Sequence, residues 1–418
     1  MSLPRLLTGV RRDRPLSLAE HHAVHGRERI GGHELIEAVS ASGLRGRGGA
    51  SFPTGAKMES VARRRGPRAV LVNAAEGEPM SAKDRALLQL NPHLVIDGGV
   101  LAAEAVGARS IAIALPADAE ATLMALHTAL GERRDRRRVE VETVPAAHLA
   151  GEESALIRYL NGGPLKPTLV PPLPSERGLR RRPTLVQNPE TLAHLALIAR
   201  HGPDWFRELG TLEHPGSALV TVSGAVRNQG MTEIACGTPF PTLMETMGGP
   251  LEPLRAVLVG GYHGVWVPAG ELSSLTLDNQ ALARFGGGLG AGVIVALGGS
   301  ACPLQEMVGT IEWLASESAG QCGPCVNGLP ALADMLRALA AGHAPREAPQ
   351  LLDRWCRQLV GRGACRLPDG AVRFVRSGVE VFAEELAEHH LRGPCRACRR
   401  TPTLQFGLSA APRPRAAA

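Results

Sequence analysis

Short strands and longer helices alternate in the first third of the chain, and this alternation constrains the fold more than any other feature of the sequence. Residues 69–73 and 110–115 have the short aliphatic pattern of buried strands, whereas residues 93–106 and 117–130 have the longer pattern of apolar helices. This order is typical of a parallel sheet whose strands are joined by crossover helices. The sequence therefore predicts an α/β domain of the nucleotide-binding type.

Further units are expected on either side of this domain. At 418 residues the chain is too long for one ordinary core, and at roughly 150 residues per domain it predicts about three domains. Residues 1–34 are rich in Arg and His and show no sustained period, which predicts an irregular arm. Prolines and arginines accumulate at residues 164–183 and indicate a long loop, after which residues 184–200 predict another helix.

The second half of the chain changes character. Short β-branched runs lie among Gly and Pro turns between residues 217 and 282, which favours a small β-rich module. Residues 293–297 then predict an apolar strand. Four helices are expected after it, at residues 304–317, 329–341, 350–360 and 378–389. They predict a C-terminal helical bundle.

Composition narrows the classes of protein to which the chain can belong. The net charge of +6 is concentrated in arginine runs at residues 133–138 and 180–182, which we expect to be solvated surface. These runs lack interleaved aromatic residues and a recognisable binding module, so nucleic-acid binding is not expected. No apolar run approaches the ~20 residues that cross a bilayer, so any membrane association should come through a partner. Eight cysteines without a secretory leader predict a cytoplasmic protein in which clustered thiols bind metal.

A glycine-rich segment at residues 42–57, SGLRGRGGASFPTGAK, is the most informative part of the sequence. Its consecutive glycines let main-chain N–H groups converge on one point, and Arg47 and Lys57 can add positive charge there. The segment is not a P-loop, because its last Gly and Lys are not adjacent, and it precedes the first clear strand, unlike a dinucleotide fingerprint. It predicts a phosphate cradle, with a mobile surface loop as the alternative.

Two glutamates follow the first expected strand. Glu76 and Glu78 come just after residues 69–73, at the carboxyl end of the strand, where α/β sheets bind ligands. A charged turn is the alternative interpretation of this segment alone.

Five motifs in a fixed order carry a resemblance to a known family. They are the glycine-rich segment, NAAEGEP at 73–79, GEE at 151–153, NPETL at 188–192 and ESAGQCGPC at 317–325. In this order they resemble the NADH-binding flavoprotein subunit of complex I and its relatives in hydrogenases and formate dehydrogenases. The match covers roughly residues 35–384.

The resemblance implies a domain organisation. A Rossmann-like FMN- and NADH-binding α/β domain is expected, followed by a small SLBB-like β-grasp module and a helical iron–sulfur domain. The expected bounds are 1–34 for the arm, 35–212 for the α/β domain, 213–285 for the β-grasp module, 286–392 for the helical domain and 393–418 for a cysteine-containing, partly disordered tail.

The resemblance also implies roles for single residues. Glu78 and Glu153 would face the nicotinamide and are the catalytic candidates. The residues expected to bind FMN, or NADH beside it, are Gly46, Arg47, Gly48, Gly49, Phe52, Lys57, Asn73, Glu76 and Asn188. Hydride chemistry belongs to FMN and NAD(H) themselves, while the protein binds, orients and tunes them.

The chain departs from the family at the edges of this site. It has Ala75, Met80, His148 and Gln187 where the family usually has Asp, Gly, Tyr and Asn. Of the aromatic residues that clamp the adenine of NADH, only Phe52 remains, because Ser60 and Leu173 stand at the other positions. The lost stacking, worth ~1 kcal/mol per ring, puts the affinity for NADH in question.

Cysteines in the last third of the chain predict an iron–sulfur site. Cys322 and Cys325 form a CxxC pair beside Gly and Pro, and thiolates at this spacing can converge on one metal or cluster. The resemblance implies a four-iron cluster with Cys365 as a third ligand and Ala319 in place of the usual first cysteine. Such a cluster would be labile or three-iron, unless a fourth ligand comes from Cys356, Cys395, Cys398, His389 or His390.

The remaining cysteines allow other arrangements. Cys395 and Cys398 form a second CxxC pair, which could complete a zinc or rearranged cluster site with Cys322 and Cys325, or could be a flexible pair of thiols. The original site is favoured over both. Cys236 and Cys302 stand alone in apolar surroundings and are expected to be ordinary buried thiols.

The predicted activity follows from these two groups of residues. Electrons would pass from NAD(P)H through FMN to the iron–sulfur centre, and then to a partner such as a ferredoxin-like protein or another subunit of a redox complex. Two alternatives stay open. One is a non-catalytic scaffold subunit that has lost its cofactor sites, and the other is a flavoprotein that uses a ferredoxin-type donor in place of NADH.

Overall fold

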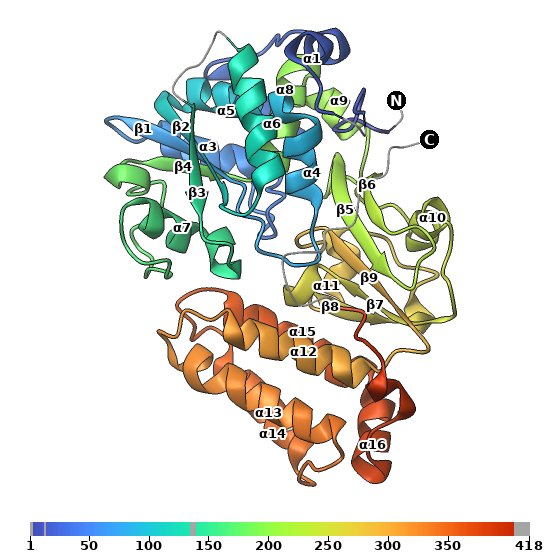
Figure 1. Cartoon of the computed structure of the whole chain (residues 1–418). Coiled ribbons are helices and arrows are strands. Elements are labelled where there is room, and N and C mark those ends of the chain that lie inside the picture. The colour runs from blue at the N-terminus through green and yellow to red at the C-terminus, as the bar shows by residue number, and fades with distance from the viewer. Residues whose placement is uncertain (1–2, 12–13, 134–138, 405–418) are drawn as a thin grey trace.

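Two β-sheets and a set of C-terminal helices follow one another along the chain and lie side by side in space (Figure 1). The computed structural model describes residues 3–11, 14–133 and 139–404. Residues 134–138 of the first arginine run and residues 405–418 of the expected tail lie outside the described residues.

The first sheet is entirely parallel, as the alternation of strands and helices predicts. Its strands, in the spatial order β3-β2-β1-β4, are β1 (Arg68–Asn73), β2 (Ala108–Pro116), β3 (Val139–Val144) and β4 (Thr184–Gln187). The chain moves from β1 outward through β2 and β3, and then returns to add β4 on the other side of β1. Such a reversal opens a crevice at the carboxyl ends of β1 and β4, where α/β sheets bind ligands.

Alternate residues of β1 face opposite sides of the sheet. Val70 and Val72 join the core formed with α5 (Pro92–Val106) and α8 (Pro189–His201), whereas Ala69 and Leu71 pack toward α7 (Glu153–Leu160). Further helices of this region are α2 (Glu34–Ser42), α3 (Thr54–Ala62), α4 (Lys83–Leu90), α6 (Glu120–Glu132) and α9 (Pro203–Arg207). The predicted helices at 93–106 and 117–130 correspond to α5 and α6.

The single helix predicted for residues 184–200 is wrong. Residues Thr184–Gln187 are β4, which is buried and pairs with β1, and α8 begins only at Pro189. Asn188 separates the two elements, because its extended backbone allows its side chain to accept a hydrogen bond from the N–H of Glu190. The pattern of apolar residues runs through this boundary without a break, so periodicity alone could not find it.

The expected irregular arm contains a helix. Helix α1 (Leu18–His25) begins at a capping box in which the Ser17 side chain and the Glu20 side chain bind each other's main-chain N–H groups. His21 and His25 on this helix are buried. Its eight residues are too few to show a clear period, but the Ser-x-x-Glu signature was readable.

The second sheet is mixed, in the order β6-β5-β9-β7-β8. Its strands are β5 (Ser217–Gly224), β6 (Gly230–Ala235), β7 (Leu254–Val259), β8 (Val265–Pro268) and β9 (Val293–Gly298), and the helices α10 (Phe240–Thr246) and α11 (Asn279–Ala283) accompany them. Strand β9 confirms the strand predicted at 293–297. It lies at the centre of the sheet, parallel to β5 and antiparallel to β7, so the helical region begins after β9 and not at residue 286.

Five helices complete the described chain: α12 (Pro303–Ser316), α13 (Leu329–Ala340), α14 (Ala348–Leu359), α15 (Leu367–Val381) and α16 (Ala383–Arg392). They share one apolar core with residues of the second sheet, such as Trp266, whose ring lies 5.1 Å from that of Phe382. Phe382 also breaks the helix predicted at 378–389 into α15 and α16, because its side chain is buried against this core.

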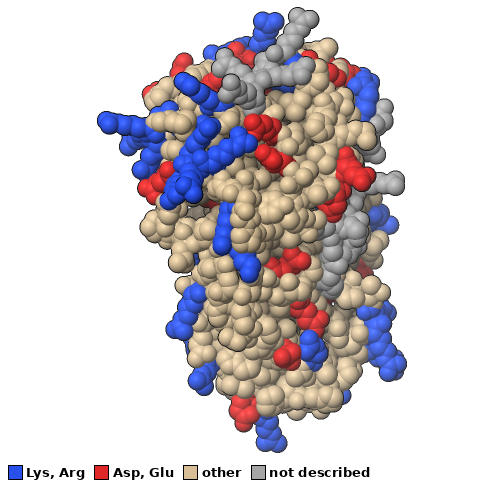
Figure 2. Space-filling view, turned by 60° about the vertical axis from the view of Figure 1, so that its left-hand side comes forward, with Lys and Arg blue, Asp and Glu red and all other residues tan. Residues whose placement is uncertain are grey.

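Charged side chains confirm one prediction and correct another. Basic residues gather on the upper part of the face in Figure 2, and Arg180 and Arg181 are exposed, as expected of solvated surface. Arg133 was assigned to the same class but is buried, with its guanidinium 2.7 Å from the carboxylate of Asp97. No helix in the described part of the chain is long and apolar enough to cross a membrane.

Helices α5 and α8 cross so closely at Gly98 that an added side chain has no room. A Cβ atom there would lie 2.0 Å from the carbonyl oxygen of Leu192, whereas at Gly99 the nearest atoms are 3.7 Å away. We expect Gly98→Ala to lower the free energy of unfolding by ~2 kcal/mol or more through overpacking. Gly99→Ala is the matched control and should be neutral or slightly stabilising, since alanine favours helix by up to ~1 kcal/mol. Chemical denaturation followed by circular dichroism measures both, and equal midpoints would contradict this crossing.

Candidate active site

Polar residues lie at the neighbouring carboxyl ends of β1 and β4, where the order of the strands in the sheet reverses. Asn73 ends β1, and its Nδ2 donates a hydrogen bond to the carbonyl oxygen of Gly151 at 2.8 Å. Asn188 follows β4, and its Nδ2 donates to Oδ2 of Asp84 at 2.6 Å. The structure thus brings these two predicted residues to the same edge of the sheet.

The loop after β1 packs tightly against the segment before α7. A Cβ atom on Gly77 would lie 2.5 Å from the carbonyl oxygen of His148, and one on Gly151 would lie 3.0 Å from that of Ala75. Nδ1 of His148 lies 2.8 Å from the carbonyl oxygen of Gly77. Burial lowers the pKa of His148, although that hydrogen bond and the charge of Glu317 raise it. The ring is therefore neutral at neutral pH and Nδ1 donates.

The glycine-rich segment turns between α2 and α3 and lies over the first turn of α8. The main-chain N–H of Arg47 donates to Oγ1 of Thr191 at 2.9 Å, and a Cβ atom on Gly48 would lie 3.3 Å from Cβ of Asn188. Gly48 and Gly49 are exposed, and Gly49 has a φ of +108°, which favours glycine. Exposed N–H groups of a loop beside a helix N-terminus form the arrangement that proteins use for phosphate.

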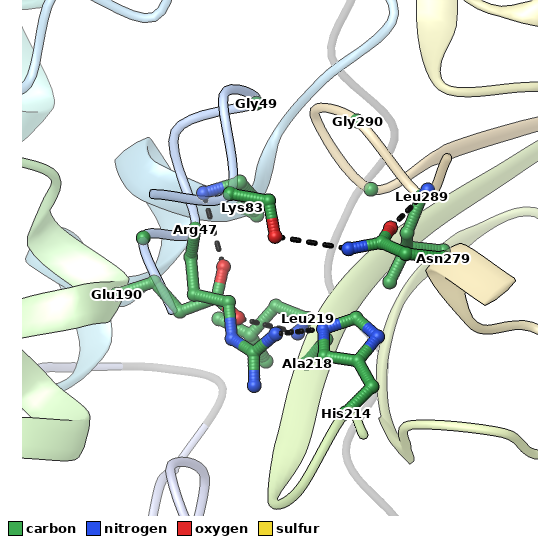
Figure 3. Close-up of a pocket in the computed structure, with 13 residues that line it drawn as sticks. Arg47, Gly49, Lys83, Glu190, His214, Ala218, Leu219, Asn279, Leu289 and Gly290 are labelled. Atoms are coloured by element: carbon green, nitrogen blue, oxygen red, sulfur yellow. Dashed lines mark hydrogen bonds and ion pairs between the residues drawn. The ribbon is translucent and has the colours of Figure 1, made fainter. Parts of the chain in front are cut away.

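The side chain of Arg47 takes a different direction from these exposed glycines. Its Nη1 lies 2.6 Å from Nε2 of His214, and its Nη2 donates to the carbonyl oxygen of Pro215 at 3.2 Å (Figure 3). Burial and, to a smaller extent, the charge of the neighbouring Arg47 lower the pKa of His214 to about 4, so the ring is neutral and accepts. Arg47 therefore ties the glycine-rich segment to the start of the second sheet.

Arg47 also lines a small hollow between the glycine-rich segment and the second sheet. Other residues around it, several of which are visible in Figure 3, are Gly46, Gly49, Ser51, Lys83, Glu190, His214, Ala218, Leu219, Asn279, Leu289, Gly290 and Gly292. Of the predicted cofactor-binding residues, only Gly46, Arg47 and Gly49 line this hollow. Of the others, Asn73 and Asn188 follow β1 and β4, Gly48 lies against Asn188, Lys57 contacts Glu153, and Glu76 binds the start of α4.

Lys57 and Glu153 form a pair at the rim of the crevice. Nζ of Lys57 lies 2.7 Å from Oε2 of Glu153, and both side chains are partly exposed. The two residues were predicted independently for the phosphate and the nicotinamide, and the structure places them in contact.

The two glutamates after β1 have separate environments. Oε1 of Glu76 accepts from the Ser81 hydroxyl at 2.5 Å and from the N–H of Asp84 at 3.1 Å, so this side chain caps the start of α4. Oε2 of Glu78 accepts from the N–H of Tyr262 at 3.0 Å, in the turn between β7 and β8. Burial raises the pKa of Glu78 to about 8, against the N–H groups of Tyr262 and Met80, which lower it.

A buried lysine that was not among the predicted site residues lies behind the crevice. Nζ of Lys83 lies 2.7 Å from Oδ1 of Asp84 and 3.0 Å from Oε2 of Glu190. The other oxygen of Glu190 accepts from the N–H of Leu219 in β5 at 2.9 Å. A compositional signal was available, because the chain contains only three lysines, at positions 57, 83 and 166.

The predicted cluster ligands gather beyond the C-terminal end of α12. Cys325 is buried, and Cys322 and Cys365 are partly buried beside it in the same apolar core, which Ala319 also contacts. Burial raises the pKa of Cys365, and the negative charges of Glu152 and Cys322 raise it further.

Three of the proposed fourth ligands lie elsewhere. Cys395, Cys398 and His389 meet Cys302, and their ligand atoms all lie within 4.8 Å of one another. Cys302 is a buried thiol, as expected, but it does not stand alone, because these three side chains surround it. Cys302 precedes α12, whereas Cys322 follows it, and a helix of 14 residues separates the two ends by ~21 Å. The Cys302 group cannot complete the Cys322 site.

The crevice and the cysteine region are joined directly. The N–H of His148 donates to Oε2 of Glu317 at 2.8 Å, and the His148 ring packs edge-on against Trp313 at 5.4 Å. Nε2 of Gln321 donates to the carbonyl oxygen of Pro167 at 2.8 Å. Segments between β3 and β4 thus contact both the end of α12 and the turn that leads to Cys322.

Comparisons with known proteins cover most of the chain. Residues 39–197 match the Nuo51 FMN-binding domain, and residues 306–389 match the NADH-ubiquinone oxidoreductase-F iron-sulfur binding region. An F-type subunit of NADH-quinone oxidoreductase from Rhizobium meliloti (strain 1021) is 33% identical over 85% of this chain and 88% of its own length. The F-type subunit from Streptomyces coelicolor is also 33% identical, over 85% and 83%.

A solved structure with a similar fold is the NAD+-reducing [NiFe]-hydrogenase in the H2-reduced state, with a TM-score of 0.79 and 32% identity. The match covers 84% of this chain and 62% of the hydrogenase chain, so this chain spans less than two thirds of that protein. The sequence resemblance is confirmed by these matches. The chain belongs to the family of F-type subunits of NADH-quinone oxidoreductase, with the FMN-binding and iron–sulfur regions of that family in the same order.

Proposed function

We propose that this chain oxidises NADH with bound FMN and passes the electrons to an iron–sulfur centre at Cys322, Cys325 and Cys365. One observation carries the proposal. The crevice at the ends of β1 and β4 borders the cysteine region, because the N–H of His148 donates to Glu317 and Nε2 of Gln321, next to Cys322, donates to the carbonyl oxygen of Pro167. A flavin in this crevice would therefore have an electron acceptor close by.

The residues at the crevice fit a flavin mononucleotide. The N–H groups of Gly48 and Gly49 and the first turn of α8 would hold its phosphate, and Lys57 at the rim can exchange its contact with Glu153 for a contact with phosphate. Asn73 and Asn188 would bind the ring system through amide groups at the strand ends. FMN supplies the conversion of a hydride into single electrons, while these side chains bind and orient it.

The cysteine region fits a cluster that lacks one protein ligand. Thiolates of Cys322, Cys325 and Cys365 would each bind one iron, and Ala319 contacts the same core without offering a ligand. The cluster would carry single electrons away from the flavin. Its partner would be another subunit of a redox complex or a ferredoxin-like protein, since the named relatives are subunits of larger oxidoreductases.

The arrangement of domains forms part of the same proposal. The second sheet would be the SLBB-like β-grasp module, and α12 to α16 would be the helical iron–sulfur domain. The β module would position the side chain of Glu78, because the main-chain N–H of Tyr262 in that module donates to the Glu78 carboxylate. The side chains of Phe52 and Leu173 are about half exposed, at 55% and 49%, and would line the approach to the nicotinamide nucleotide.

Anaerobic purification tests the proposal as a whole. The absorbance spectrum should show flavin and iron–sulfur bands, chromatography of the extracted flavin should give FMN, and NADH should bleach the flavin band. A flavin that only a reduced ferredoxin bleaches would favour the alternative donor. A chain that binds no flavin even after reconstitution would favour a scaffold subunit.

Lys57→Ala should weaken retention of FMN by about tenfold or more, because a charged contact to phosphate contributes ~1.5–3 kcal/mol. The matched control is Arg63→Ala, at the end of the same helix, since the Arg63 side chain is 77% exposed and pairs with Glu59, which is itself exposed. Fluorescence titration of the apoprotein with FMN gives both dissociation constants. Equal constants in the two variants would remove Lys57 from the phosphate site.

Glu78→Gln should change the dependence of stability on pH. Because burial raises the folded pKa of Glu78 from 4.5 to about 8, the unfolded chain ionises first, and the wild type loses stability as pH rises through that interval. The variant lacks this loss and should gain stability relative to the wild type between about pH 5 and pH 8, on the order of 1 kcal/mol per pH unit at most. Glu59→Gln, at an exposed site, is the control. A difference that is constant with pH would contradict an elevated pKa.

Ala319→Cys should raise the iron content of anaerobically purified protein and slow the loss of iron in air, because it restores a thiolate beside the three present. Ala121→Cys, at an exposed position of α6, adds a thiol far from the cluster and should change neither quantity. Iron analysis with a timed exposure to oxygen measures both. Equal iron content and equal rates of loss in the two variants would contradict a cluster at this site.

A further inference from the structure

Cys302, His389, Cys395 and Cys398 form a second group of metal-binding side chains, separate from the proposed cluster. Cys302 precedes α12, and His389 lies near the end of α16. Cys395 precedes the short turn that follows α16, and Cys398 lies within that turn. Figure 1 shows α16 beside the helices of the bundle, close to where the chain enters α12 from the second sheet. Residues separated by as many as 96 positions thus meet at one point.

The distances within this group match a single ion. Sγ of Cys302 lies 3.4 Å from Sγ of Cys398, which lies 3.7 Å from Sγ of Cys395. Nε2 of His389 lies 3.9 Å from the sulfurs of Cys302 and Cys398. A tetrahedral zinc ion with bonds of about 2.3 Å to sulfur and 2.0 Å to nitrogen places sulfurs ~3.8 Å apart and sulfur and nitrogen ~3.5 Å apart.

The histidine is oriented for this role. Nδ1 of His389 lies 3.0 Å from the carbonyl oxygen of Ala340 at the end of α13. A carbonyl can only accept, so the proton is on Nδ1, and the lone pair of Nε2 points toward the three sulfurs. Metal-binding histidines are commonly held by such a hydrogen bond from the other ring nitrogen. His389 and Cys302 are each only 3% exposed, so the hydrogen bond and the sulfur contacts are enclosed in the core.

Two other interpretations of the group fit less well. In a four-iron cluster each thiolate binds a different iron, which spreads the sulfurs more widely than around one ion. A disulfide requires sulfurs ~2.05 Å apart, and it would use two thiols while leaving the third thiol and the histidine unexplained. Three thiolates and an imidazole are a common closed ligand set for structural zinc.

We infer that Cys302, His389, Cys395 and Cys398 bind one structural zinc ion that fastens the end of the chain to the start of α12. Binding releases three thiol protons and leaves a net charge of −1 on the site. Four arginines, at positions 392, 396, 399 and 400, lie close in sequence and offset that charge. Four protein ligands leave no open position for water, so the ion is structural and not catalytic.

A second contact fastens the same segment and supports this role. The main-chain N–H groups of Thr403 and Leu404 donate to the two carboxylate oxygens of Glu306, at 2.6 Å and 2.8 Å. Glu306 lies in the first turns of α12, and both it and Leu404 are buried. The chain after Cys398 therefore stays along α12, so the ligands contributed by α16 and by the following turn are held close to Cys302.

Metal analysis of the full chain, purified anaerobically without added metal, tests the inference. One zinc per chain is expected, and X-ray absorption at the zinc edge should fit three sulfurs and one nitrogen. Zinc bound with mostly oxygen or nitrogen ligands, iron in place of zinc at this stoichiometry, or a Cys302–Cys398 or Cys395–Cys398 disulfide in freshly prepared protein would each overturn it.

Neighbouring histidines provide a matched pair of variants. His389→Ala should lose most of the zinc and lower the thermal midpoint, whereas His390→Ala should keep one zinc per chain. Cys395→Ser tests the same site at an exposed ligand, where misfolding is not expected. Iron and flavin content should not change in these variants, so the result is independent of the proposed electron transfer. Loss of iron together with zinc, or zinc retained in both ligand variants, would show that the four residues do not form a separate zinc site.

Discussion

Lys83 forms buried ion pairs with the carboxylates of Asp84 and Glu190, and these hold together the segments that form the crevice. Lys83 begins α4, Glu190 lies in the first turn of α8, and Glu190 also binds the N–H of Leu219 in the second sheet. Burial alone would lower the pKa of Lys83, but Asp84, Glu190 and Glu76 raise it, so the lysine stays charged. Removal of one partner from such a buried pair costs ~3–5 kcal/mol, because it leaves an uncompensated charge. The network therefore fixes the helix starts and the second sheet relative to the ends of β1 and β4.

The parts of the fold that the sequence predicted are those with a long and local signal. Strands β1 and β2 and helices α5 and α6 have clear periods, and their order alone implied a parallel sheet. Strand β4 was missed because its four residues are buried at every position and run into α8. The break at Phe382 was missed because a buried phenylalanine fits a continuous apolar helix as well as a junction. In both cases packing against distant residues decides the structure, and local propensity does not contain that information.

The candidate site divides in the same way. The glycine-rich segment and the asparagines at the strand ends could be found because turns and strand ends have local signatures. The direction of the Arg47 side chain could not be found, because its partners His214 and Pro215 are more than 160 residues away in sequence. Cys302 gave no signal either, since a lone cysteine before a proline looks like any buried thiol. Its ligand partners become visible only when α16 folds back beside α12.

Helix α12 connects the two proposed metal-binding regions, and both of its ends are fastened by contacts with other parts of the chain. At its C-terminal end, Glu317 accepts a hydrogen bond from His148 in the turn between β3 and α7, and the turn to Cys322 begins there. At its N-terminal end, the Cys302 group and Glu306 hold the last described residues of the chain. Electron transfer from a flavin requires the cysteines to keep a fixed distance from the crevice, and a helix free at one end could tilt. In the proposed cluster, Ala319 would leave one covalent restraint missing, so the helix that precedes it would have to be positioned by contacts outside the cluster. The fastening at Cys302 supplies such a restraint ~21 Å away, at the far end of the same rigid element.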